Sequence, residues 1–504
     1  MARDDARLMS LAERTARGAV WTILTSMGGR VIGVLGTVIM TRFLAPDVVG
    51  EVSAATILVM TASWLTTWGF GPYVVVKGRG EHLQEIVWHG TVAYVGLGLA
   101  VLIPMAFLGG YMTPWFGAKD AAQYVPGMAL VVLIKRIGAM PERVLVRDMR
   151  FRTSGMAAAT GELVYTVVAL SFAAGGWGGM SVIYGNLAQS LVTTGLLIRA
   201  AGIKSWATPT PLSKSRILDM LRFGAPLALE GVAHNASRYW DNLMISHYFG
   251  TAKMGTYNMA YNLADIPAVQ IGEQITSVLL PSMSEMAPER RPAALERSTA
   301  LLSILIFPLA VGLGLVADPL IAVVLPADRW QEVAPLLTVL ATLSVFRPVT
   351  WVLSTYMETQ DRTARMMFLE VGKLMLILVG IAVLSRFGLL AAAGSIGVAF
   401  GLTSLLGVVL VVRDDPANGP SPRRLAAGFL QPLLACGVMA AVVLVLRTQV
   451  LAPLGLRPLY LLIIEIAVGG VVYVAAAMVL CRDTARDLLS MLRRIARRGK
   501  REDG

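Results

Sequence analysis

Long apolar stretches recur along the whole chain, and each is long enough to cross a lipid bilayer as one helix. A transmembrane helix needs about 20 mostly apolar residues, and only helices or closed barrels satisfy their backbone hydrogen bonds inside a bilayer. Fourteen such stretches lie near residues 18–41, 51–76, 86–110, 122–142, 155–175, 179–199, 223–247, 255–281, 299–325, 333–357, 366–386, 389–412, 427–446 and 458–481. The sequence therefore predicts an all-α integral membrane protein with about 14 transmembrane helices.

The composition fits this class and excludes several others. Charged residues make up 15% of the chain, against about 25% in soluble proteins. Residues 1–18 are charged and polar, and the apolar stretch after them is long enough to span the membrane, so we expect no cleavable signal peptide. Cys436 and Cys481 both fall in late apolar stretches, so we expect no disulfide framework. The sequence has no P-loop, GxSxG or Cys/His metal pattern, which predicts a non-enzyme without a metal or other cofactor.

Lys and Arg are distributed unevenly between the two sides of the predicted helices. With the N-terminus placed in the cytoplasm, the inside segments hold 31 of the 44 basic residues, the outside segments hold 7, and 6 lie within spans. Cytoplasmic loops carry such an excess. This predicts an N-in/C-in topology and explains the net charge of +12 without a nucleic-acid partner. The tail from Arg482 alternates apolar and basic faces, which predicts an amphipathic helix bound to the lipids of the inner leaflet.

Two pairs of similar segments indicate an internal repeat. TRFLAPDVVGEVSAA (41–55) resembles SHYFGTAKMGTYNMA (246–260) at an offset of 205, and FRTSGMAAATGE (151–162) resembles DRTARMMFLE (361–370). Each pair relates one helix to the helix six positions later, which preserves orientation in the membrane. The predicted parts are an N-lobe of helices 1–6 (1–215), a C-lobe of helices 7–12 (216–412), and a linker, two further helices and the basic tail (413–504).

Basic residues occur at bilayer depth in helices that the repeat makes equivalent. Arg30 and Arg238 lie in helices 1 and 7, while Lys135 with Arg136 and Arg347 lie in helices 4 and 10. Each charge at that depth costs about 2.5–3.5 kcal/mol on the insertion scale and persists where it faces a polar cavity or another charge. We predict that these five residues bind an anionic substrate in a cleft between the lobes. Alternatively, Lys135 and Arg136 extend from the cytoplasmic end of helix 4 to the membrane surface.

Acidic residues and one histidine accompany these cations. Glu230, His234 and Arg238 follow at intervals of four residues, and Asp241 comes three residues later, so all four share one helix face. The residues predicted to form a polar network in the cleft or an ion-coupling site are Glu230, His234, Asp241, Asp265 and Glu273. The alternative is a ladder of charges that only locks helix 7.

Three other acidic residues at bilayer depth have structural explanations. Glu370 and Lys373 are spaced i, i+3 and are expected to neutralise each other. Glu162 is expected near a helix start, where a carboxylate interacts favourably with the helix dipole. Glu465 lies outside the repeat and is expected to be structural.

Three segments carry a resemblance to a known family. They are ARGAVWTILTSMGGRVIGVLGTVIMTRFLAPDVVGEVSAA near the start, RVLVRDMRFR after helix 4, and LRFGAPLALEGVAHNASRYWDNLMISHYFGTAKMGTYNMAYNLADIP across helices 7 and 8. They resemble the MOP superfamily and, within it, the polysaccharide flippases of the Wzx class. The resemblance covers roughly residues 15–412.

This resemblance implies two six-helix bundles that open alternately to the two sides of a bacterial inner membrane. It implies a flippase that moves undecaprenyl-pyrophosphate-linked oligosaccharides to the periplasmic leaflet, with a polysaccharide polymerase or export complex as a candidate partner. Arg30 matches a basic position of helix 1 in the related lipid II flippases, and Arg238 with Asp241 matches the polar run of helix 7. The alternatives are a lipid II flippase and a cation-coupled multidrug exporter. No acidic residue lies between Glu13 and Asp47, where such exporters carry an Asp. Coupling to H⁺ or Na⁺ and the membrane potential are both open as energy sources.

Overall fold

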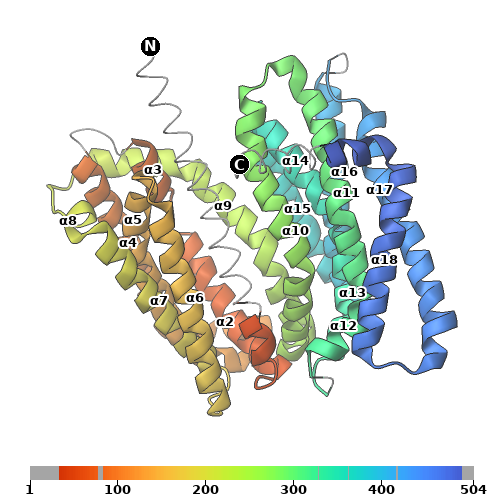
Figure 1. Cartoon of the computed structure of the whole chain (residues 1–504). Helices are drawn as coiled ribbons and strands as arrows, with labels where there is room; N and C mark the ends of the chain where they lie inside the picture. Colours follow the sequence, from red (N-terminus) through yellow and green to blue (C-terminus); the bar gives the residue numbers. More distant parts are fainter. Residues whose placement is uncertain are drawn as a thin grey trace, which may run out of the picture. The chain divides into compact units, whose positions relative to one another are not determined.

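The computed structural model describes residues 33, 35–77, 83–326, 328–360, 362–415 and 418–490 (Figure 1). Within these residues every regular element is a helix, which agrees with the predicted all-α class. The chain divides into two compact units, one ending at Gly255 and the other beginning at Thr256. The predicted lobe boundary at 215/216 refers to the sequence repeat, and it remains a prediction.

The helices of the first unit follow one another with short connections. They are α2 (Pro46–Trp64), α3 (Phe70–Lys77), α4 (Leu83–Leu108), α5 (Val125–Arg147), α6 (Phe151–Ala174), α7 (Met180–Ala201), the short α8 (Ile203–Trp206) and α9 (Lys214–Phe249). α10 (Thr251–Glu285) begins in the first unit and continues into the second. A helical stretch over 35–40 is the described end of the first predicted span.

The second unit holds the rest of α10 and the helices that follow it. Its elements are α11 (Arg291–Leu315), α12 (Ala317–Val324), α13 (Val333–Leu343), α14 (Arg347–Glu358), α15 (Thr363–Leu384), α16 (Leu389–Asp414), α17 (Pro422–Val445) and α18 (Pro458–Leu480). α17 and α18 correspond to the two predicted helices after the linker. Residues 482–490 continue as a helix, and the rest of the predicted amphipathic tail lies outside the described residues.

Nine helical segments in the described part of the chain are long and apolar enough to cross a membrane. α5, α9 and α10 are also long enough, at 23, 36 and 35 residues. They are not among the nine, and they carry most of the predicted site residues, whose charges lower the apolarity of a helix. The chain is thus a multi-pass membrane protein, whereas the count of 14 spans and the orientation remain predictions.

The predicted single span over 51–76 is wrong, because the helix breaks after Trp64 and resumes at Phe70. Trp68 takes a positive φ of 42° in the turn between the two helices. Residues other than glycine rarely adopt a positive φ. The next residue, Gly69, also has a positive φ (62°), which glycine adopts without steric cost. The break leaves carbonyl groups at the end of α2 that need partners, since lipid offers none.

Hydrogen bonds join α9 to the other helices of the first unit near its start and in its second half. At its start, the Ser213 N–H donates to Nε2 of the fully buried His89 at 2.8 Å, and His89 Nδ1 lies 2.7 Å from the Glu85 carbonyl oxygen. The Glu85 carboxylate accepts a hydrogen bond from Arg216, which lies outside the predicted spans. This hydrogen bond raises the pKa of the Arg216 guanidinium. Further along, Trp240 Nε1 donates to Thr61 Oγ1 of α2 at 3.1 Å.

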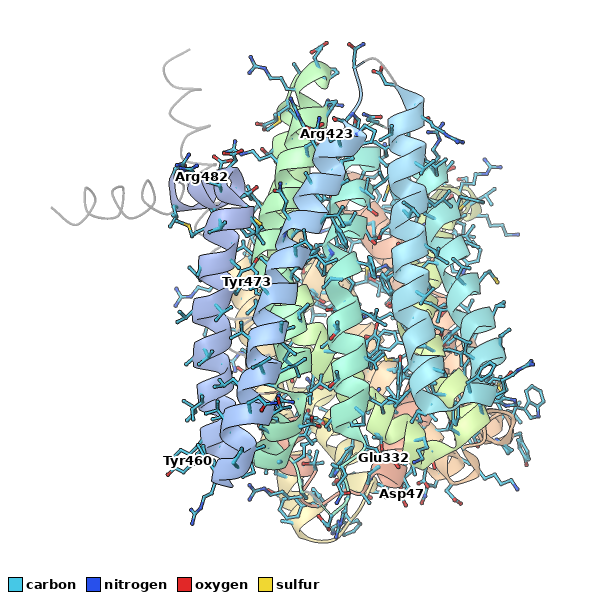
Figure 2. All side chains as sticks on the ribbon, turned by 90° about the vertical axis from the view of Figure 1, so that its right-hand side faces the viewer. Asp47, Glu332, Arg423, Tyr460, Tyr473 and Arg482 are labelled. Atoms are coloured by element: carbon cyan, nitrogen blue, oxygen red, sulfur yellow. The ribbon has the colours of Figure 1, made fainter. Side chains whose placement is uncertain are left out.

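The last two helices, α17 and α18, pack into the core of the second unit. Tyr473 of α18 is buried, and its hydroxyl donates to the Ile304 carbonyl oxygen of α11 at 2.8 Å. Glu465 of α18 is 2% exposed and accepts two hydrogen bonds from Arg447, of 2.7 and 2.6 Å. Arg447, in a π-helical turn after α17, also donates to the Leu315 carbonyl at the end of α11. Figure 2 shows Tyr473 between Tyr460 and Arg482, which lie near the two ends of α18.

Candidate functional site

Three of the predicted site residues have no described side chain. Arg30 lies outside the described residues. Glu230 and Glu273 lie on α9 and α10, and their side chains are likewise outside the described part of the chain. Their proposed roles remain predictions.

Arg136 is enclosed by the helices of the first unit. It is 2% exposed, and its guanidinium lies over the Tyr94 ring at 4.5 Å. Nη1 donates to the Tyr94 carbonyl at 2.9 Å, Nε donates to Ser63 Oγ at 3.2 Å, and Nη2 donates to the Ser63 carbonyl and Thr66 Oγ1. Ser63 lies in the last turn of α2, and Thr66 lies in the turn between α2 and α3. Arg136 therefore satisfies the carbonyl end of a helix at bilayer depth, where a positive charge also favours the helix dipole.

Lys135 and its neighbour Arg136 have opposite environments. Successive residues of a helix point about 100° apart, and Lys135 is exposed where Arg136 is buried. Lys135 interacts electrostatically with Glu162 of α6. The Glu162 carboxylate accepts a hydrogen bond of 2.7 Å from Gln189 Nε2 of α7. We call Lys135, Glu162 and Gln189 the α5–α7 polar cluster.

The described end of the first predicted span reaches the same cluster. A Cβ atom placed on Gly33 would lie 3.6 Å from Glu162 Oε2. Glu162 lies eleven residues after the start of α6 at Phe151, so the expected position near a helix start, with its dipole interaction, is wrong. The carboxylate instead joins three helices of one unit. Sequence reasoning placed Lys135 in a binding site and missed its carboxylate partner.

The predicted stripe on α9 runs from an exposed to a buried position. His234 is exposed, Arg238 is partly buried, and Asp241 is 1% exposed. The Asp241 carboxylate accepts hydrogen bonds from the backbone N–H and the side-chain amide of Asn242, at 2.8 and 2.9 Å. Arg238 lies 5.9 Å from the Tyr239 ring. The shared helix face is therefore present, and its buried end is held by local hydrogen bonds.

In the second unit a predicted cation meets a predicted anion. Arg347 of α14 forms an ion pair with Asp265 of α10, and both side chains are almost buried. The guanidinium also lies 5.2 Å from the Tyr261 ring and 5.1 Å from the Phe400 ring of α16. The attraction within a buried ion pair offsets the free energy of desolvating its two charges only when the geometry is good and further contacts are present. Here the two aromatic rings provide further contacts for the guanidinium.

A second ion pair lies beside the first. Lys373 and Glu370 of α15 are 2.7 Å apart, as their i, i+3 spacing predicts, and Lys373 Nζ lies 4.9 Å from the same Phe400 ring. Phe400 is therefore in contact with both Arg347 and Lys373. Nothing in the local pattern around Phe400 identifies it, because aromatic residues are common in apolar helices. Among the described residues, no group of three or more His, Cys, Asp or Glu could hold a metal ion.

Comparison with known proteins identifies the family. The model of a family described as "Polysaccharide biosynthesis protein" matches residues 39–335. The chain is 24% identical to the lipopolysaccharide biosynthesis protein WzxC of Escherichia coli (strain K12) over 82% of this chain and 84% of that protein. It is 26% identical to the succinoglycan biosynthesis transport protein ExoT of Rhizobium meliloti (strain 1021) over 66% of each chain.

The fold also has a known counterpart. The structure of the lipid II flippase MurJ in an inward closed conformation superposes with a TM-score of 0.75 at 15% identity, over 92% of this chain and 99% of that one. This similarity establishes the fold alone. The family match confirms the resemblance drawn from the sequence at the level of the family: the chain belongs to the polysaccharide biosynthesis protein family.

Proposed function

We propose that this protein is a flippase that moves undecaprenyl-pyrophosphate-linked oligosaccharide units from the cytoplasmic to the periplasmic leaflet of a bacterial inner membrane. The product would feed the biosynthesis of a surface polysaccharide. The observation that carries the proposal is the family match over residues 39–335, which includes Lys135, Glu162 and Arg238. In this proposal fourteen helices, N-in and C-in, open a cationic central cleft alternately to each side.

The environments of the basic residues divide them into two groups. Arg136 contacts buried groups of the first unit, and Arg347 pairs with Asp265 in the second unit. We therefore assign both arginines to holding the helices of their own unit together. Lys135 is exposed and Arg238 is partly buried, so both side chains have surface that can meet a headgroup. A pyrophosphate needs several cationic donors to replace its water, and Arg can bind it bidentately. We assign substrate contact to Lys135 and Arg238, with Arg30 as the third candidate.

The driving force follows from the charge of the substrate. An anion that leaves a negative interior gains about 2.3 kcal/mol per charge per 100 mV of membrane potential. Exchange with H⁺ or Na⁺ at the acidic residues is the alternative. Collapsing the membrane potential at constant pH and Na⁺ gradients separates the two, because only the first mechanism would then stop.

Mass spectrometry of polyprenyl-linked glycans in a deletion strain tests the proposal. We expect one complete, unpolymerised, undecaprenyl-linked repeat unit to accumulate and the matching surface polymer to disappear. Complementation with Lys135→Met should leave the accumulation in place at normal protein levels. Lys119→Met is the matched control, since Lys119 is an exposed lysine in the segment between α4 and α5. Unchanged glycan pools in the deletion strain would refute the flippase assignment.

Two alternative functions give different results in the same strain. A lipid II flippase has the similarity to MurJ in its favour, and it predicts that depletion arrests cell-wall synthesis and accumulates lipid II. A multidrug exporter predicts changed tolerance of cationic compounds with unchanged glycan pools.

A further inference from the structure

An exposed apolar stripe runs along one side of α4. Its residues follow one another at helical spacing, so they share one face of the helix. They are Gly96, Leu99, Ala100, Ile103 and Phe107, and we call them the α4 stripe. Among the described residues, nothing lies within 4 Å of a Cβ atom added to Gly96. Ile103 is 46% exposed and Phe107 is 77% exposed.

The predicted repeat relates α4 to α11, since it pairs the third predicted helix with the ninth. Each of the two helices has one proline in its interior, Pro104 in α4 and Pro308 in α11. Aligning these prolines gives an offset of 204, close to the 205 that relates 41–55 to 246–260. The positions of the α4 stripe then pair as Gly96 with Ala300, Leu99 with Ser303, Ala100 with Ile304, Ile103 with Phe307 and Phe107 with Val311.

The paired face of α11 is covered by α17 and α18 within the second unit (Figure 1). Ile304, Phe307 and Val311 are 5%, 0% and 8% exposed, and they belong to one apolar cluster with residues of α17 and α18. The α17 helix passes close to Ala300, because a Cβ atom added to Gly428 would lie 3.1 Å from the Ala300 Cβ. As a result, 50% of the spanning window of α11 is buried, against 22% in α4.

The composition of the α4 stripe is that of a face against which another helix packs. Lipid contact gives no reason for a glycine, which is disfavoured in a helix by about 1 kcal/mol relative to alanine. Small residues four positions apart let two membrane helices approach closely, and Gly96 and Ala100 have this spacing. The paired residue Ala300 is small at the place where α17 approaches α11. The repeat thus shows what covers such a face, namely transmembrane helices.

We propose that the α4 stripe is the contact between two copies of this chain, related by a two-fold axis along the membrane normal. Copies that insert with the same topology have parallel α4 helices, and this axis sets each stripe against itself. Gly96 and Ala100 of one copy leave room for Leu99 and Ile103 of the other. The α4 stripe has no charged residue, so its self-contact brings no like charges together. The inference goes beyond the proposed function and holds for any transported substrate.

Cysteine cross-linking in native membranes tests the contact. In a background with Cys436→Ala and Cys481→Ala, Leu99→Cys and Ile103→Cys each place a single thiol on the α4 stripe. The two-fold axis sets each residue near its own counterpart, and a disulfide needs Cα atoms within about 7 Å. Oxidation with copper phenanthroline should therefore link the two copies.

Val167→Cys on α6 is the control for random collision. Val167 is exposed and lies as far after Phe151, the start of α6, as Leu99 lies after Leu83, the start of α4. We expect little linked dimer at this position. Equal linking at position 167 and on the α4 stripe would overturn the proposal.

A leucine at position 96 should separate the two copies without disturbing the fold of either. Its Cβ meets nothing within 4 Å in the described part of the chain, whereas across the contact it would hold the two helices apart. We expect Gly96→Leu to raise the dissociation constant of the dimer in liposomes about tenfold, a change of about 1.4 kcal/mol. Gly437→Leu on α17 is the matched control, since a Cβ there also meets nothing within 4 Å. Equal effects of the two substitutions would refute the assignment of the α4 stripe.

Counting copies of the parent chain decides the question without any variant. Single-molecule photobleaching of labelled protein in liposomes, over a range of protein-to-lipid ratios, gives the number of copies in each particle. We expect pairs to form as the protein density rises. Single copies at every density would overturn the proposal, even if Gly96→Leu failed to fold. Linking of Leu99→Cys to a different membrane protein, with the chain itself single, would overturn it as well and assign the α4 stripe to that partner.

Discussion

The close fit between Gly98 and Arg136 gives a prediction in which one substitution changes sign with its background. Gly98 is on α4, and a Cβ atom there would lie 2.5 Å from Arg136 Cδ and 3.0 Å from its Nη1. The guanidinium cannot move aside freely, because its nitrogens donate to groups on α4 and at the end of α2. Gly98→Ala should therefore be destabilising, whereas in an Arg136→Ala background the added methyl group enters vacated space.

The expected magnitudes follow from three contributions. Overpacking a buried site costs about 1–3 kcal/mol, while alanine is favoured over glycine in a helix by about 1 kcal/mol. Gly98→Ala alone should thus lower the free energy of unfolding by about 0–2 kcal/mol. With Arg136→Ala present, the same change should raise it by up to about 1 kcal/mol. Arg136→Ala itself should cost about 2–3 kcal/mol, from four acceptors at about 0.6 kcal/mol each in a membrane protein.

A double-mutant cycle on purified protein in mild detergent measures these terms. Unfolding is followed by titration with a denaturing detergent for the parent, the two single variants and the double variant. We expect a coupling of about 1–3 kcal/mol between the sites. Gly437→Ala is the control, since a Cβ there meets nothing within 4 Å. Equal effects of Gly98→Ala in both backgrounds would mean that Arg136 is not held at this position, and the assignment of Arg136 to a structural role would fail.

Three further predictions concern the other polar contacts. Asp265→Asn or Arg347→Ala alone should lower the unfolding temperature by leaving a buried charge unpaired, and the double variant should recover part of the loss; additive losses would contradict the ion pair. Glu465→Gln should destabilise the protein by about 1–3 kcal/mol in the same titration, because Arg447 loses a charged acceptor; an unchanged midpoint would refute this. His89→Ala should increase trypsin cleavage after Lys214, the first residue of α9, since it removes the acceptor that holds the start of this helix; a parent-like digestion pattern would show that other contacts hold this segment.

The sequence predicted the features that depend on composition and local spacing. Apolar stretches of the right length identified the helical membrane class, and within the described residues nine of them reappear as helices long and apolar enough to span. The i, i+3 spacing predicted the ion pair of Glu370 and Lys373. The repeat at 41–55 and 246–260 marked two helix starts that the structure brings into contact.

Features that depend on tertiary packing were beyond local reasoning. Lys135 and Arg136 look alike in the sequence, and only the packing of α4, α2 and α5 decides which of them is buried. The pairing of Arg347 with Asp265 joins residues 82 positions apart. The break after Trp64 is followed by Gly69, Gly71 and Pro72, which favour turns and helix starts, but these residues lie inside one long apolar stretch that predicts a single helix. The buried cation that caps the end of α2 is visible only in the structure.

The way in which α17 and α18 are attached bears on how such chains lengthen and shorten. Apolar surface that a lost helix uncovers in a membrane is covered again by lipid at little cost, because lipid tails are as apolar as leucine. The polar contacts are different. The Leu315 carbonyl and Asp318 would lose Arg447, and Arg297 would lose Asp487. The Ile304 carbonyl would lose Tyr473, and Glu296 would lose Ser421 and Arg424. A chain that ended after α16 would thus need changes at only these few positions. A pair of transmembrane helices can therefore be added to or lost from such a chain as one unit when a small number of polar residues change with it.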